Sequence, residues 1–504
     1  MSAEWPLRSL KDVADLLTGF PFKSKDYSND ENGYKLLRGD NIVQGCFRWE
    51  DVKRWPKSLL IDKDVKYFLK EGDVILAMDR PWIEAGLKFA QISSIDMPCL
   101  LVQRVACLRA NETLDQDFLR YLISSYSFVE YVKQVQTGTA VPHISGKQIL
   151  NFEFNLPPKI VQKSTSKILK SLDNKIQLNN QINQTLEQMA QAIFKSWFID
   201  FEPTRAKIIA KEQGANLATQ ELAAQAIICG AFTLEQLAEV EQNLETTLQQ
   251  AIDEKLNQHK QTNPTALNAQ QLKTTAALFP NELVESELGD VPEGWAISSV
   301  GEHVKVTKGR SYKSVELEES DTALVTLKSF MRGGGYREDG LKAYTGAYKP
   351  EQVVEPGELV MSLTDVTQAA EIIGKPAIVT KNNDFKTLVA SLDVSILRPK
   401  KKEMKEYFYG LMSTYRFHRY AESFATGTTV LHLNTKGITS FEFALPDFEL
   451  CRVFSKMVLP MLAVQQSNIH LSRTLEELRD SLLPKLLSGE LDVSALADNS
   501  QSGA

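Results

Sequence analysis

Cysteine is scarce in this chain, with only five in 504 residues, and no two of them form a CxxC pair. The odd count excludes a complete disulfide framework and gives no indication of a zinc site. Long apolar runs are also missing: the first twelve residues already carry charge, and no later stretch approaches a membrane span. We therefore expect a cytoplasmic protein with no membrane partner, whose cysteines are small buried hydrophobes.

The motifs of common enzymes are missing too. The Gly-Lys pairs at 146–147 and 374–375 are followed by Gln and Pro, which excludes a phosphate-binding loop. Residues 155–158, Asn-Leu-Pro-Pro, lack the aromatic residue of an amino-methyltransferase signature, and a strand end explains them better. Asp393 with Glu and Lys in 403–405 loosely fits a nuclease spacing, but within a charge run that is more naturally a solvated loop. With six histidines and none at metal-ligand spacing, we predict no catalytic, cofactor-binding or metal-binding residue.

Acidic charge is concentrated in one segment of the chain. The net charge is −7, yet residues 200–290 alone hold 14 acidic and 6 basic residues. The remainder of the chain is therefore close to neutral, and a near-neutral domain can still bind nucleic acid if its cations cluster on one face.

A repeat is the most informative feature that is present. Residues 137–158, TGTAVPHISGKQILNFEFNLPP, match residues 426–447, TGTTVLHLNTKGITSFEFALPD, at 12 of 22 positions with an offset of 289. A nearby offset of 290 aligns Trp5 with Trp295. The chain is thus a duplication of a globular stretch followed by a long helix, and two similar surfaces in one chain suit a target with two parts.

Each repeat mixes short strand-like runs with one helical stretch. In the first we expect strands at 73–78 and 98–108 and a helix at 115–136. In the second we expect a strand at LVMSL, one buried strand through TLVASLDVSILR, and a helix through YFYGLMSTYRFHRYAESF. The FEFNLPP and FEFALPD segments read as strands that end at proline. Both repeats are predicted to be α+β domains.

Apolar residues at nearly heptad spacing follow each repeat. The first stripe, which is interrupted by Asn179, runs from Ile168 to Trp197, and the second runs from Val464 to Leu486. A single amphipathic helix more often packs on its own domain, but two matched helices in one chain favour packing on each other. The residues predicted to pair the helices are Leu172, Ile176, Ile182, Leu186, Met189, Ile193, Leu471, Leu475, Leu478 and Leu482.

The acidic segment at 200–290 differs from both repeats, being rich in Ala, Gln, Leu and Glu. We expect helices at 216–228 and 233–257 that are exposed or face a partner, and a polar linker at 258–275. A solvated helical connector is the simpler interpretation of this insert.

The loops of both repeats contain residues that can contact DNA. Arg and Lys bind guanine or phosphate, and Asn can pair with adenine. In the first repeat the candidates are Arg38, Asn41, Arg80, Trp82, Lys88, His143 and Lys147; in the second they are Lys308, Arg310, Tyr312, Lys313, Lys328, Arg332, His432 and Lys436. The two histidines occupy equivalent positions beside the TGT turns, where a structural role in the loop is the alternative. The two sets differ while the framework repeats, as expected if the repeats read different sequences.

The order of several sequence segments along the chain resembles that in the specificity subunits of type I restriction-modification systems, and the resemblance covers nearly the whole chain. The resemblance rests on both TGT segments and on KLLRGDNI at 35–42, GDVILAMDRPWIEAGLKFA at 72–90, PCLLVQRVACLR at 98–109, LDNKIQLNNQINQTLEQMAQAIFKSWFIDFEP at 172–203, ELGDVPEGW at 287–295 and LEELRDSLLPKLLSGEL at 475–491.

The resemblance implies an α+β fold in which two similar target-recognition domains are separated by an antiparallel pair of long coiled-coil-like helices, with a helical insert between the repeats. The implied boundaries are 1–158 for the first domain, 159–199 for the central helix, 200–290 for the acidic insert and linker, 291–447 for the second domain, 448–491 for the C-terminal helix and 492–504 for a flexible tail.

The implied function is recognition of double-stranded DNA with two half-sites by a subunit without catalytic activity. Its expected partners are two modification subunits, which carry S-adenosylmethionine and methylate adenine, and restriction subunits, which carry ATP and Mg. The alternative from another class is a stand-alone coiled-coil scaffold that binds proteins through its insert; a self-sufficient nuclease or methyltransferase is a weaker one.

Overall fold

The computed structural model describes residues 5–138, 141–240, 242–262, 267–332, 334–366 and 370–493, without the side chains of 259–262. The tail predicted for 492–504 lies outside these residues from 494 onward. The chain divides into two compact units: unit 1 comprises 1–179 with 470–504, and unit 2 comprises 180–469. Each of the two long helices contributes one half to each unit.

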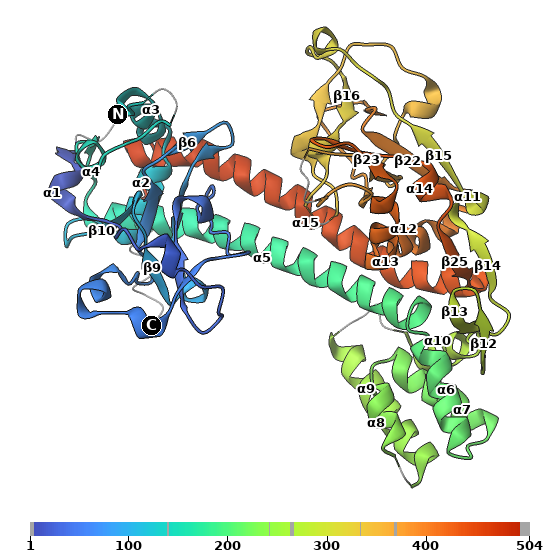
Figure 1. The fold of residues 1–504 in the computed structure, drawn as a ribbon. Coiled ribbons are helices and arrows are strands. Elements are labelled where there is room, and N and C mark those ends of the chain that lie inside the picture. The colour runs from blue at the N-terminus through green and yellow to red at the C-terminus, as the bar shows by residue number, and fades with distance from the viewer. Residues whose placement is uncertain are drawn as a thin grey trace. The chain divides into compact units, whose positions relative to one another are not determined.

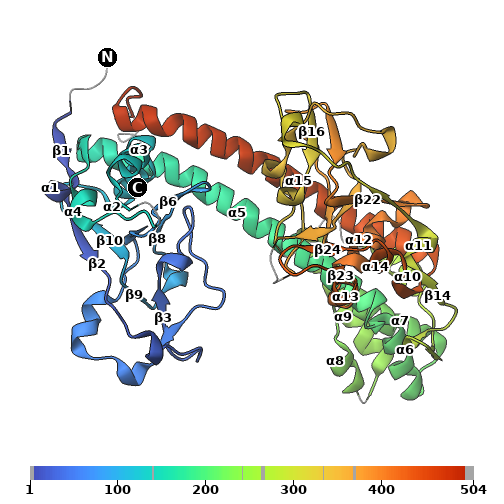
Figure 2. The same ribbon diagram turned by 45° about the horizontal axis from the view of Figure 1, so that its top comes forward.

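Two small sheets form the framework of unit 1 (Figure 2). The strands of the antiparallel first sheet follow the order β2 (Ala14–Thr18), β10 (Val105–Ala110), β5 (Val74–Ala77) and β8 (Phe89–Gln91). The second sheet has the order β4 (Arg54–Trp55), β3 (Tyr34–Leu37) and β9 (Cys99–Leu101). All four residues of β5 are buried, because alternate side chains enter two different cores: Val74 and Leu76 one, Ile75 and Ala77 the other.

Short helices and strand pairs surround these sheets. They are β1 (Leu7–Ser9), α1 (Leu10–Val13), β6 (Trp82–Ile83), β7 (Gly86–Leu87), α2 (Gln116–Ser124), α3 (Tyr126–Val135), α4 (Gly146–Leu150) and β11 (Glu153–Asn155), with β1 paired to β11 and β6 to β7. The helix α5 (Lys159–Phe198) then begins directly after Pro158.

Unit 2 repeats this arrangement. Its sheets follow the orders β15 (Val304–Lys308), β22 (Val394–Pro399), β18 (Leu359–Ser362), β20 (Pro376–Ile378), and β17 (Lys342–Ala343), β16 (Thr322–Val325), β21 (Thr387–Ala390). The surrounding elements are β12 (Leu283–Ser286), β13 (Gly289–Pro292), β14 (Ala296–Ser299), α11 (Val300–His303), β19 (Thr364–Asp365), α12 (Lys405–Ser413), α13 (Tyr415–Ser423), β23 (Ala425–Thr426), β24 (Leu431–Leu433), α14 (Lys436–Thr439), β25 (Glu442–Leu445) and α15 (Phe448–Ser488). The two α+β domains inferred from the sequence repeat are confirmed.

Several predicted elements are divided in the structure. The helix expected at 115–136 is two helices, because Ser125 ends α2 and caps α3 by accepting a hydrogen bond from the Phe128 backbone N–H at 3.2 Å. Thr414 divides the matching helix of unit 2 in the same way. The runs predicted as single strands at 98–108 and 387–398 are likewise two strands each, separated by a tight turn.

The insert has a core of its own, unlike the solvated connector that its composition indicated. Its helices are α6 (Glu202–Glu212), α7 (Leu217–Ile228), α8 (Leu234–Ala238), α9 (Leu244–Thr262) and α10 (Ala269–Ala276), drawn in green in Figure 1. The helix expected at 233–257 is therefore broken, and the segment expected as a linker contains α10. Alanines pack with Leu237, Leu248 and Leu272 in this core, since small side chains let the helices approach closely.

The long helices run antiparallel to each other in each unit. In unit 1, Arg479 of α15 reaches Asp173 of α5 at 3.0 Å, and the Asn179 amide donates to the Ser472 hydroxyl at 3.1 Å. In unit 2, Asn468 donates to the side chain of Asn183 at 2.9 Å. Residue numbers rise along α5 as those of its partners fall along α15, so the prediction that the matched helices pack on each other is confirmed.

Polar residues occupy much of the line of contact between α5 and α15, which we call the seam. This corrects part of the apolar stripe that the sequence predicted. Met189, Leu471 and Leu478 are exposed by 40%, 40% and 44%, so they lie outside the contact between the helices, as does Val464 at 47%. The seam on α15 instead follows Asn468, Ser472, Leu475, Arg479, Leu482 and Leu486. The hydrophobic pattern missed it because polar side chains that are paired across the seam take positions of the heptad that apolar residues usually fill. The remaining predicted pairing residues, Leu172, Ile176, Ile182, Leu186, Ile193, Leu475 and Leu482, are buried or half-buried.

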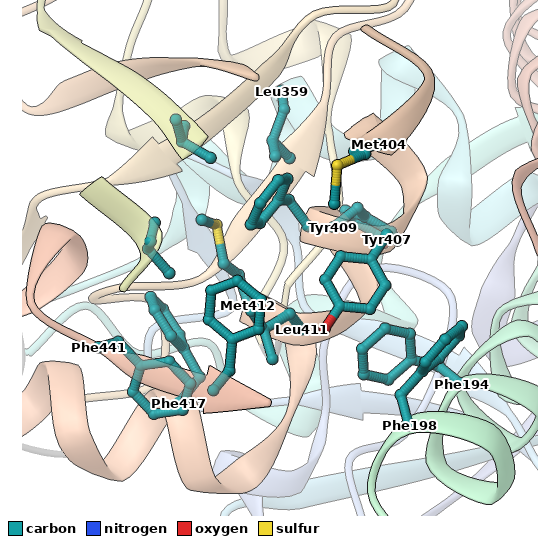
Figure 3. Packing of buried hydrophobic residues seen from close by; sticks show 14 of the residues in the cluster. Phe194, Phe198, Leu359, Met404, Tyr407, Tyr409, Leu411, Met412, Phe417 and Phe441 are labelled. Atoms are coloured by element: carbon teal, nitrogen blue, oxygen red, sulfur yellow. The ribbon is translucent and has the colours of Figure 1, made fainter. Parts of the chain in front are cut away.

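Aromatic side chains anchor α5 to unit 2. Figure 3 shows Phe194 and Phe198 beside Tyr407 of α12. The ring centroids of Phe194 and Phe198 lie 5.4 and 5.0 Å from that of Tyr407. Trp197 is 2% exposed and contacts Phe454 of α15. The same cluster continues through the core of the second α+β domain, so the end of α5 is fixed by apolar burial.

In unit 1 a half-buried carboxylate joins the domain to both long helices. Asp173 accepts from Arg120 at 2.5 Å, from the Tyr121 hydroxyl at 2.8 Å and from Arg479 at 3.0 Å. Burial alone raises the pKa of Asp173, but the charge of Arg120 and these hydrogen bonds outweigh it and hold the pKa below its usual value.

Replacing Asp173 with Ala should lower the free energy of unfolding by about 3 kcal/mol, the lower end for a buried ion pair, because two half-buried arginines lose their shared partner. Asp173→Asn should lower the free energy of unfolding by less, since the amide keeps the shape of the carboxylate and one oxygen that accepts hydrogen bonds. Because the folded-state pKa is depressed, the advantage of wild type over Asp173→Asn should be complete above about pH 5 and shrink below about pH 4. Urea unfolding between pH 3 and pH 8 measures this, and a difference that stays constant with pH would contradict the assignment.

Candidate nucleic-acid interface

Equivalent loops carry the matched histidines in the two units. In unit 1 the backbone of Thr137 pairs with that of His143 through hydrogen bonds of 2.7 and 2.8 Å. Between them Gly138 adopts φ +92°, and a Cβ there would come within 2.7 Å of the Val141 carbonyl. Gly427 in unit 2 has φ +119° and faces Val430 in the same way. Only glycine fits this turn, which explains the TGT signature that both repeats share.

In unit 1, Asp79 lies between His143 and an arginine that the sequence did not single out. The Asp79 carboxylate is 2.6 Å from Nδ1 of His143 and 3.1 Å from Arg104. Asp79 follows β5 and Arg104 precedes β10; the backbone bond from Met78 to Arg104, 2.9 Å long, holds the two segments together. This cluster sits where the two strands leave the sheet.

The arginines on either side of Asp79 have unusual backbones. Arg80 has φ +45° and Arg104 has φ +69°, a left-handed conformation that costs a non-glycine residue of order 1 kcal/mol or more. Strain of this kind persists where the surrounding structure enforces it and is concentrated at functional sites. The pair therefore marks this end of the sheet as a candidate interface.

Further cations gather near Asp79. Burial lowers the pKa of Lys88, with the charges of Asp40, Arg80 and Asp79 acting on the same ammonium group. Lys133 lies over the ring of Trp82 at 4.4 Å. The structure thus brings the predicted residues Arg80, Lys88 and His143 into one neighbourhood.

Arg38 and Asn41 are engaged within their own loop. The Asn41 side-chain oxygen accepts from the Arg38 backbone N–H at 3.0 Å, and the Asn41 side-chain NH2 donates to the Arg48 backbone carbonyl at 3.0 Å. Arg38 also pairs with Asp40 at 2.6 Å. Asn41 holds this turn in shape, so its amide group is occupied in the structure.

In unit 2 the frame is the same but the residues differ. Thr364 takes the place of Asp79, and its hydroxyl donates to Asp393 at 2.7 Å. His432 Nδ1 lies 3.4 Å from the same hydroxyl. Asp393 in turn replaces Arg104, so the nuclease-like spacing noted for Asp393 is explained by a structural bond.

The other predicted residues of unit 2 are distributed over several loops. Burial raises the pKa of Tyr312, and the nearby charge of Asp393 adds to this effect, which places Tyr312 beside the His432 cluster. Arg310 follows Gly309, where the chain passes to the second sheet, and Arg332 pairs with Glu371 at 3.3 Å. The remaining cations are exposed: Lys308, Lys313, Lys328 and Lys436, together with Lys147 of unit 1.

Sequence reasoning missed Asp79, Arg104 and Thr364, and it noted Asp393 only for its nuclease-like spacing. Each lies at a strand end, and only the pairing of strands far apart in the sequence brings them to the histidines. Among the described residues no group of three His, Cys, Asp or Glu side chains could hold a metal ion. Within the same residues, every helix is too short or too polar to cross a membrane.

Comparisons with known proteins point to one family. Residues 2–188 match the family described as the type I restriction modification DNA specificity domain. The chain is 28% identical over 510 residues to the type I restriction enzyme HindI specificity subunit of Haemophilus influenzae, covering 97% of this chain and 100% of that one. It is 21% identical to the MjaIX specificity subunit of Methanocaldococcus jannaschii, covering 98% and 95%. A crystal structure of a type I S subunit from M. genitalium aligns with 96% of each chain at 13% identity and a TM-score of 0.46.

Proposed function

The chain belongs to the specificity-subunit family of type I restriction-modification systems, and from this we propose that its two α+β domains each read one half of a bipartite site in double-stranded DNA. The subunit itself performs no catalysis. It directs two modification subunits, which carry S-adenosylmethionine, and restriction subunits, which carry ATP and Mg, to that site.

One observation supports two unlike half-sites above all others. The same backbone frame carries different side chains at equivalent positions: Asp79 against Thr364, and Arg104 against Asp393. A duplicated reader that bound a palindrome would keep the same chemistry in both frames, because base edges are distinguished by their donor and acceptor pattern. The cations around Asp79 and the Asp393 carboxylate behind His432 suit different base sequences.

The exposed apolar side chains on the long helices support a protein partner. Leu178, Met189, Leu471 and Leu478 lie on helices whose seam is already filled, and each is at least 40% exposed. We infer that these side chains contact the modification subunits, because burial against a partner would remove their apolar surface from water.

Methylation mapping of a host carrying the complex tests the proposal. We expect modified adenines in a motif of two unlike half-sites separated by unspecified bases. A continuous motif or a perfect palindrome would contradict it. Gel shifts on random DNA, with and without the modification subunits, separate this function from the stand-alone scaffold, for which no sequence-specific shift is expected.

A further inference from the structure

The hydrogen bonds around His143 fix which ring nitrogen carries a proton. Nδ1 faces the Asp79 carboxylate at 2.6 Å, and an ionised carboxylate only accepts hydrogen bonds. Nδ1 therefore carries a proton while Asp79 is ionised, and the additional proton of an imidazolium goes to Nε2, which can then donate. The carboxylate itself is held by Arg104 and lies at the end of β5, so the ring orientation is built into the sheet.

In unit 2 the contact equivalent to that of His143 runs through a hydroxyl group. The single hydroxyl proton of Thr364 is donated to Asp393 at 2.7 Å, because that carboxylate can only accept. The hydroxyl oxygen is then left to accept from Nδ1 of His432, 3.4 Å away. Asp393 thus acts through Thr364 where Asp79 acts directly.

Nδ1 is thus the ring nitrogen that each imidazole uses for its contact within the protein. Among the described residues, the hydrogen bonds of His143 and His432 involve only Nδ1 on the ring. The His143 side chain is 33% exposed and His432 is exposed. Two unlike sets of residues that produce the same ring orientation indicate that Nε2 is the atom that matters.

We propose that His143 and His432 each donate a hydrogen bond from Nε2 to a DNA phosphate, and that Asp79 in unit 1 and Thr364 with Asp393 in unit 2 are the positioning residues. The inference rests on the proposed function. A phosphate fits better than a base, because the histidine is common to both units whereas its neighbours differ, and the backbone is what two unlike half-sites share. With Nδ1 already carrying a proton, Nε2 donates only from the imidazolium, so the proposed contact takes up a proton and sets one positive charge against one phosphate.

The salt dependence of binding tests the contacts themselves. The full complex with its modification subunits is titrated with a duplex carrying the mapped site over a range of KCl concentrations. His143→Ala and His432→Ala should each reduce the slope of log K against log [salt] by about one and weaken binding about fivefold at 0.15 M salt. Lys273→Ala, which removes an exposed cation from the insert, is the control and should leave the slope unchanged.

Neutral backbone substitutions identify the partner atom. A single methylphosphonate is moved along each half-site, and we expect one position per half-site where it weakens binding of the wild type but not of the matching histidine variant. If base analogues that lack an exocyclic amino group show this behaviour instead, Nε2 accepts from a base and the phosphate assignment is overturned.

Double variants test the positioning residues. Asp79→Ala should reduce the slope as His143→Ala does, and the two together should do no more than either alone. Asp79→Asn, which keeps an oxygen that accepts from Nδ1, should retain most of the slope. In unit 2, Thr364→Val should behave like His432→Ala, whereas Thr364→Ser should behave like wild type. The salt slope of Arg104→Ala is measured as a control, because the loss of Asp79 also leaves the Arg104 guanidinium without this ion-pair partner.

The outcomes separate this inference from the proposed function. If the wild-type complex binds no bipartite site, the proposed function fails. If the complex binds such a site but folded His143→Ala and His432→Ala variants keep the full salt slope, the function stands and the histidines are structural residues of their loops.

Discussion

Exchanging residues 1–158 for the equivalent domain of a relative should change one half-site of the recognised sequence and leave the other unchanged. The expectation follows from the structure of unit 1, whose sheets and candidate interface are built from this segment. Pro158 is a suitable junction because α5 begins at the next residue. Methylation mapping of the chimeric complex reads both half-sites in one experiment, and the expected change in target preference is large, since each mismatched base pair costs about 1 to 3 kcal/mol.

The chimera must keep the contacts that hold the domain to the long helices. Arg120 and Tyr121 bind Asp173 of α5, and the ring of Trp5 lies against Gly489 at the end of α15. The donor domain should therefore carry Trp, Arg and Tyr at the matching positions. A control that exchanges 291–447 should alter the other half-site alone. Altered bases in both halves, in a folded chimera, would mean that the domains do not read independently.

The sequence predicted the fold well wherever the signal was local. The start of α5 after Pro158 and the strand at 73–78 depend on neighbouring residues, and the structure places them within a residue or two. The breaks at Ser125 and Thr414 were missed because an apolar pattern continues across them, although a Ser or Thr in the middle of each stretch is itself a capping signal.

The candidate site was predictable only in part. Arg80, Lys88 and His143 could be chosen by residue type, because cations and polar rings in loops suit nucleic acid. Asp79 and Arg104 could not, since they are 25 residues apart and meet only because β5 pairs with β10. The seam of the long helices shows the same limit: Asn468 and Ser472 look like surface residues until their partners on α5 are known.

Inserting four residues into each long helix, at the same level of the pair, should lengthen the unspecified spacer by one or two base pairs. At ~1.5 Å per residue, the 40 residues of α5 and 41 of α15 make helices of about 60 Å. That exceeds the ~34 to 36 Å of one DNA turn, so helices of this length can hold two readers a turn apart. Four residues add about 6 Å, against ~3.4 Å per base step.

The register of the pair decides where the insertions belong. Asn179 meets Ser472 and Asn183 meets Asn468, so a break after Gln181 lies opposite a break after Ile469. Sites near Gln184 and Arg473, which the offset of 289 between the repeats aligns, do not lie opposite each other in the antiparallel pair. Four residues turn an α-helix by about 40° beyond one full turn, which nearly preserves the seam on both sides.

Methylation mapping of this variant should show both half-sites unchanged and farther apart. The control carries the insertion in α5 alone. It moves Asn179 and Asn183 apart along α5, while their partners Ser472 and Asn468 on α15 keep their spacing, so one of the two polar pairs must break. We expect that control to unfold more easily and to lose recognition, because an unpaired buried amide costs about 1 to 3 kcal/mol. If the matched variant is folded and active but methylates sites with the original spacer, the helices do not set the distance between the half-sites.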